Sequence, residues 1–136
     1  MTKRAFLVLG PESSGTRLMT RLLIAAGCYG DDGDDQRLDH GLPADEALIV
    51  WRRSLPHRGE WPDLRAMIRG LEAAGYETTA IVMSGKPDPN IVSTRISQVY
   101  AQIFYALHVT STLGEIVDLD ALTKRPAEVV GHLMHR

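Results

Sequence analysis

The part of the chain best suited to chemistry is residues 10–17, which read Gly-Pro-Glu-Ser-Ser-Gly-Thr-Arg. The glycine spacing G-x-x-x-x-G allows successive backbone N–H groups to turn inward around an anion. Serine and threonine hydroxyls can add hydrogen bonds, and Arg17 can add a charge-assisted, bidentate contact. The segment predicts an anion-binding loop, and a tight turn with a capping serine is the alternative interpretation. The expected ligands of the anion are Pro11, Glu12, Ser13, Ser14, Gly15, Thr16 and Arg17.

This loop departs from the Walker A motif at two positions. Thr16 stands where that motif has lysine, and Arg17 stands where it has serine or threonine. The first change removes the usual contact to the β- and γ-phosphates, and the second removes a Mg²⁺ ligand. A metal-dependent nucleoside triphosphatase is therefore disfavoured, and we expect no metal.

A second group of polar residues follows the apolar run at 47–51. Arg52 and Arg53 could hold an anionic donor or acceptor. His57 ordinarily titrates near neutral pH, which makes it the first candidate for a general base. The alternative interpretation is that these residues form a solvated loop surface.

The elements that must position these groups alternate along the chain. Apolar runs predict strands at 5–9, 47–51, 78–83 and 115–119. Helical spacing of apolar residues predicts helices at 16–26, 64–74 and 91–107 and a last helix that begins at Pro126. This order predicts a single α/β domain over residues 1–136, with about four parallel strands and helices on both faces.

The resulting three-layer architecture predicts a P-loop NTPase-like fold with the strand order 2-3-1-4. Ligands of such sheets bind at the carboxyl ends of the strands. Residues 10–17, 52–60, 84–97 and the segment after residue 119 should therefore surround one crevice.

The first loop resembles that of sulfotransferases that use 3′-phosphoadenosine 5′-phosphosulfate. Ser14, Gly15, Thr16 and Arg17, followed by a leucine-rich helix, fit the 5′-phosphosulfate loop of that family, whereas Ser13 stands at a position that is usually basic. The resemblance implies a sulfuryl donor nucleotide and a hydroxyl or amine acceptor, and Arg17 and His57 are the candidate catalytic residues for that transfer. The acceptor cannot be read from the sequence.

The resemblance extends to two later segments. The family binds the 3′-phosphate with a basic residue after a strand and a serine about eight positions later, which implicates Lys86 with Ser93, or alternatively Ser97. The second alignment places Pro89 at the basic position. The strand at 115–119 and the helix after Pro126 are similar to a late element of the family, so the chain would be a reduced or truncated core.

Composition limits the alternatives. The 136 residues carry a net charge of −2, which argues against nucleic-acid or polybasic membrane partners, and no apolar run is long enough to span a bilayer. The acidic residues concentrate in 27–46, and we expect a flexible acidic loop at 28–44, at the amino ends of the strands and away from the anion loop. The lone Cys28 is expected to be structural, and the protein cytoplasmic.

Two other functions remain open at this point. A degenerate P-loop nucleotide kinase would bind ATP with Mg²⁺. A non-enzymatic module would keep the anion loop without turnover, which Ser13 and Pro89 favour. A small-molecule nucleotide is the expected partner in each case, and the oligomeric state is not predicted.

Overall fold

The computed structural model describes residues 2–57, 59–85 and 93–135. Four parallel strands form one sheet in the order β2-β1-β3-β4. The strands are β1 (Lys3–Pro11), β2 (Leu48–Leu55), β3 (Tyr76–Ser84) and β4 (Leu113–Asp118). From its third residue onward β1 is buried, as expected of a central strand that is covered on both faces.

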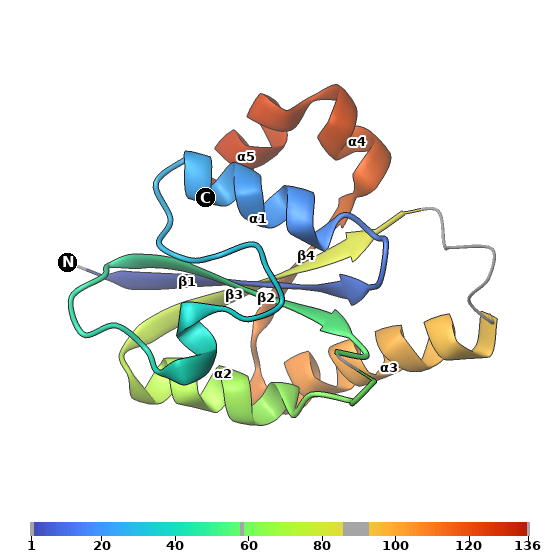
Figure 1. Ribbon diagram of the computed structural model, residues 1–136, viewed down its shortest axis with the longest axis horizontal. Coiled ribbons are helices and arrows are strands. Elements are labelled where there is room, and N and C mark those ends of the chain that lie inside the picture. Colours follow the sequence, from blue (N-terminus) through green and yellow to red (C-terminus); the bar gives the residue numbers. More distant parts are fainter. Residues whose placement is uncertain (1, 58, 86–92, 136) are drawn as a thin grey trace.

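Helices cover both faces of the sheet (Figure 1). One face carries α1 (Thr16–Ala25), α4 (Leu119–Lys124) and α5 (Pro126–Met134). The other face carries α2 (Leu64–Ala73) and α3 (Ser93–Thr110). Side chains alternate along β1: Phe6 and Val8 pack toward α1, whereas Leu7 packs toward α2 and α3. The prediction of an α/β fold with a parallel sheet between helices is confirmed.

The predicted strand order 2-3-1-4 is wrong. β2 pairs directly with β1 from Arg4 opposite Leu48 to Pro11 opposite Leu55, so no strand lies between them. β3 pairs with the other side of β1. Residues 29–41, which we call the acidic strap, cover the outer edge of β2. Because the strap protects this edge, β2 does not need β3 as a neighbour. The observed order 2-1-3-4 is also the one in which flavodoxin-type doubly wound sheets begin.

The acidic strap is closely attached to the sheet. Tyr29 exchanges backbone hydrogen bonds with β2, and the side chain of Gln36 is fully buried against Arg52. Leu38, in the short 3₁₀ helix η1 (Arg37–His40), is only 2% exposed. The flexibility expected of residues 28–44 stays a prediction, but Gln36 and Leu38 are buried and attach the strap to the edge of the sheet.

Several element boundaries also differ from the prediction, and two of these differences lie beside the cleft described below. β2 continues through Arg52 and Arg53 to Leu55, whereas the apolar run ends at Trp51. The strand predicted to reach Leu119 ends at Asp118. Helix α4 begins at Leu119, and Asp118 is its N-cap residue. None of the helices that the structure describes is long and apolar enough to cross a membrane.

Candidate functional site

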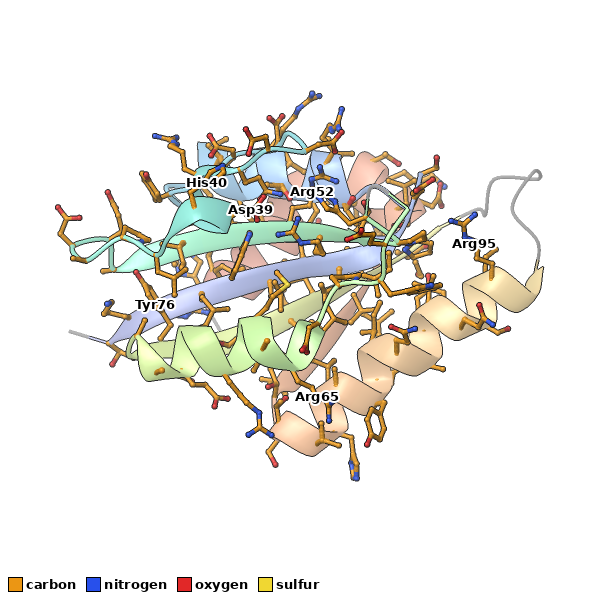
Figure 2. The ribbon with its side chains drawn as sticks, turned by 60° about the horizontal axis from the view of Figure 1, so that its bottom comes forward. Asp39, His40, Arg52, Arg65, Tyr76 and Arg95 are labelled. Atoms are coloured by element: carbon orange, nitrogen blue, oxygen red, sulfur yellow. The ribbon has the colours of Figure 1, made fainter. Side chains whose placement is uncertain are left out.

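A cleft of about 600 Å³ lies at the carboxyl ends of β1 and β2. The β1–α1 loop and the first turn of α1 form one side, and β2 with the acidic strap forms another. Figure 2 labels Arg52 on β2, and Asp39 and His40 on the part of the strap that lies beside this strand. The cleft is lined by Glu12, Ser13, Gly15, Thr16, Arg17, Asp34, Arg52, Ser54, His57 and Leu119.

The β1–α1 loop is closed by its own hydrogen bonds. Both the backbone N–H and the hydroxyl of Ser14 donate to the Pro11 carbonyl, at 3.2 and 2.6 Å. The Ser14 side chain is buried beneath the loop, where a Cβ on Gly10 would come within 2.5 Å of its Oγ. Ser14 therefore shapes the loop from below, and its neighbours Ser13 and Gly15 line the cleft.

The loop leads directly into the N-terminus of α1, as the sequence predicts. Gly15 is the N-cap residue at φ 93°, and no side chain from the described residues caps this helix end. The first turn also contains no acidic residue. The positive end of the helix and its first N–H groups are thus available to an anion in the cleft.

Arg52 supplies a buried cation at the floor of the cleft. Its side chain is only 4% exposed. The Nη1 group lies 3.4 Å from the hydroxyl of Thr16, and Nη2 donates to the Gly33 carbonyl at 2.8 Å. Its Nε is buried and has no hydrogen-bond partner among the described residues. A second guanidinium, that of Arg17, is half exposed at the mouth of the cleft.

The acidic strap reaches this cleft, so its predicted position away from the anion loop is wrong. Asp34 Oδ1 accepts hydrogen bonds from Arg52 Nη2 at 3.0 Å and from Arg17 Nη2 at 3.3 Å. The hydrogen bond from Arg52 is the main cause that lowers the pKa of Asp34 below its ordinary value. The strap arrives here because the chain after α1 runs along β2 in the strand's direction, with Tyr29 beside Ile49 and Gln36 beside Arg52.

The structure brings several predicted site residues together. His57 and Ser54 line the same cleft as Arg17, and the backbone of His57 is held by two hydrogen bonds with Glu60. An imidazole that lines this cleft could accept a proton from a bound acceptor. The predicted residues that line the cleft are Glu12, Ser13, Gly15, Thr16, Arg17 and His57.

The predicted 3′-phosphate site is only partly described. Lys86 and Pro89 and the side chain of Ser93 lie outside the described residues. Ser97 is exposed on α3 and does not line the cleft. Arg95, labelled in Figure 2, lies near Pro11 and Glu12 in a separate small cavity.

Asp34 and Ser54 line the cleft but were not singled out from the sequence, although Ser54 lies in the range 52–60 expected around the crevice. Ser54 directly follows the two arginines, but the strand was expected to end before it. Asp34 is one of many acids in its segment, and no local pattern distinguishes it. A buried glutamine two residues later is the feature that fixes its place, and burial of Gln36 is not visible in the sequence.

Comparison with protein-family models, with curated proteins and with solved structures finds no match for this chain. Among the residues that the structure describes, no three His, Cys, Asp or Glu side chains are grouped so that they could hold a metal ion.

Proposed function

We propose that this chain is a sulfotransferase-like enzyme whose β1–α1 loop binds the anionic group of the donor. In this proposal the β1–α1 loop, Arg17 and Arg52 bind the 5′-phosphosulfate of 3′-phosphoadenosine 5′-phosphosulfate. The observation that carries the proposal is the uncapped N-terminus of α1, which opens into a cleft with one buried and one half-exposed guanidinium. These are the groups that stabilise a phosphate or sulfate oxyanion.

The chemistry requires positioning and charge stabilisation more than covalent participation by the protein. The acceptor oxygen or nitrogen attacks sulfur, the bond from sulfur to the bridging phosphate oxygen breaks, and 3′-phosphoadenosine 5′-phosphate leaves. The guanidiniums and the helix N-terminus stabilise the charge that develops on the leaving phosphate. His57 takes the proton of the acceptor. No metal ion is needed for these roles.

The 3′-phosphate is assigned to the segment between β3 and α3. Lys86 with Ser93, or alternatively Ser97, would hold it, as the family resemblance implies. Because β3 pairs with β1, its carboxyl end lies beside the β1–α1 loop. A nucleotide whose 5′ group lies in the cleft could therefore extend over this edge of the sheet.

Binding of the product nucleotide tests the donor site. We expect calorimetry to detect 3′-phosphoadenosine 5′-phosphate binding that weakens about 10- to 100-fold in Arg17→Ala, the loss typical of a charge-assisted hydrogen bond. Arg21→Ala is the matched control, because Arg21 is on the same helix and pairs with Asp32 but does not line the cleft. It should change affinity less than twofold. Equal binding by wild type and Arg17→Ala would refute the site.

Two further measurements separate the functions. Equal affinity for adenosine 5′-phosphate would remove the 3′-phosphate part of the proposal. Sulfuryl transfer from the donor to a panel of hydroxyl and amine acceptors tests the enzyme. Nucleotide binding without any transfer would instead favour a binding module that has lost turnover, consistent with Ser13 at a position that is usually basic in the family. Binding of ATP only with Mg²⁺ would favour the kinase.

A further inference from the structure

A single carboxylate oxygen joins both cationic side chains of the cleft. Asp34 Oδ1 is 3.0 Å from Arg52 Nη2 and 3.3 Å from Arg17 Nη2. Arg52 also contacts the hydroxyl of Thr16, the first residue of α1. The Asp34 carboxylate is therefore an anion bound by the same guanidiniums that an external anion would need.

We propose that Asp34 is an internal substitute for the anionic ligand and that it must leave Arg17 and Arg52 before a ligand can bind. The proposal rests on the anion site proposed above and adds an autoinhibitory contact to it. The buried guanidinium of Arg52 explains why such a substitute is needed. A buried cation without a counter-charge is strongly destabilising, so Asp34 neutralises it before a ligand binds, and the ligand takes over that role.

The local structure allows residue 34 to move while the acidic strap stays in place. The Asp34 side chain is 59% exposed, so it can turn away from the arginines while the Gly33 carbonyl keeps its hydrogen bond from Arg52 Nη2. Two residues later, the fully buried Gln36 side chain bonds both the N–H and the carbonyl of Arg52, at 3.0 and 2.8 Å. The exchange therefore requires only a short segment beside this anchor to shift.

Other acids of the strap do not have this arrangement. Asp32 pairs with Arg21, and Asp35 pairs with His40, in both cases outside the cleft lining. Asp32→Asn is thus a matched control for Asp34→Asn. Both substitutions remove one negative charge from the same strap, but only one removes the charge that competes for Arg17 and Arg52.

Titration calorimetry with inorganic pyrophosphate on the whole chain tests the exchange. Asp34→Asn should bind pyrophosphate about tenfold more tightly than wild type, because the ligand no longer displaces a carboxylate. Asp32→Asn should stay within about twofold of wild type. In an Arg17→Ala background, the gain from Asp34→Asn should shrink, because one of the two contested guanidiniums is absent. Circular dichroism checks that each variant is folded.

The possible outcomes separate this inference from the proposed function. Unchanged or weaker pyrophosphate binding by Asp34→Asn would overturn the inference, and weaker binding would mean that Asp34 positions the arginines for the ligand. An equal gain in Asp32→Asn would also overturn it, because general charge would then be the cause. If Asp34→Asn gains affinity for pyrophosphate but no variant prefers 3′-phosphoadenosine 5′-phosphate to adenosine 5′-phosphate, the inference stands and the nucleotide assignment fails.

Discussion

Gly10, near the end of β1, and Gly15, at the start of α1, are both fixed by close packing. A Cβ on Gly15 would lie 2.5 Å from Leu119 Cδ1, and the residue has φ 93°, a conformation that other residues rarely adopt. A Cβ on Gly10 would meet the Ser14 hydroxyl and the side chain of Met83. The spacing of the glycines and their place between a strand and a helix could be read from the sequence. Their contacts with Met83 and Leu119 could not, because those residues are far away along the chain.

Cys28 is a residue whose reactivity follows from burial. It is 4% exposed in the core cluster beneath α1, and burial raises the pKa of its thiol to about 11, with a smaller opposing effect of Arg4. The sequence predicted a structural cysteine, and the buried position of Cys28 agrees with that prediction.

We therefore expect Cys28 to react with iodoacetamide at pH 8 far more slowly in the folded protein than in the unfolded chain. The reactive thiolate is scarce at that pH, and the sulfur is inaccessible. Mass spectrometry of samples quenched over time, with and without denaturant, measures both rates. Similar rates in the two samples would contradict the burial of this residue.

At the scale of elements, the acidic strap explains the length of β2. The apolar run stops at Trp51, so local periodicity predicted the end of the strand there. The strand continues because strap carboxylates neutralise the two buried arginines, Asp34 on Arg52 and Asp39 on Arg53. Partners separated by more than ten residues leave no periodic signal, so neither the extension of β2 nor the strap's position could be predicted from the sequence.

Gln36 is the central attachment of the strap to β2. Its amide replaces a neighbouring strand by bonding the backbone N–H and carbonyl of Arg52. Gln36→Ala should lower the free energy of unfolding by roughly 2–4 kcal/mol, because it leaves two buried backbone groups without partners. Urea denaturation measures the change.

Gln98→Ala is the matched control for this substitution, because Gln98 is exposed on α3. It should change the stability by less than about 0.5 kcal/mol. A loss for Gln36→Ala no larger than that of the control would show that the strap is not anchored at this residue.

At the scale of the whole molecule, the small net charge is the sum of an acidic strap and a basic remainder, and the structure pairs the two in space. The strap contributes Asp32, Asp34 and Asp39, and their partners lie on α1 and β2. Composition correctly separated an acidic segment from a basic remainder. The spatial arrangement was predicted wrongly, because only the strap's path along β2 brings the acidic groups to the cleft. The total charge argued against a general polyanion binder. The charge inside the cleft is set instead by the local pairs of Asp34 with Arg17 and Arg52.

Acid should weaken this pairing, and Asp39 should contribute most to the effect. Burial raises the pKa of Asp39, but hydrogen bonds from the Trp51 indole, the Arg53 guanidinium and the Gln36 N–H together lower it below its ordinary value. With a side chain only 18% exposed, Asp39 is screened less by solvent than the other strap aspartates. A lowered pKa in the folded state stabilises the protein above the unfolded value, which is about 3.9.

The stabilisation from Asp39 should therefore be complete above about pH 5 and be lost as the pH falls through 4 toward the pKa of the folded state. Urea denaturation from pH 6 to pH 3 should show a smaller decrease in unfolding free energy for Asp39→Asn than for wild type, together with lower stability at pH 6. Asp120→Asn, which removes an exposed partner of Lys124, should follow the wild-type slope. Parallel curves for Asp39→Asn and wild type would mean that the strap's attachment to β2 does not depend on the charge of this carboxylate.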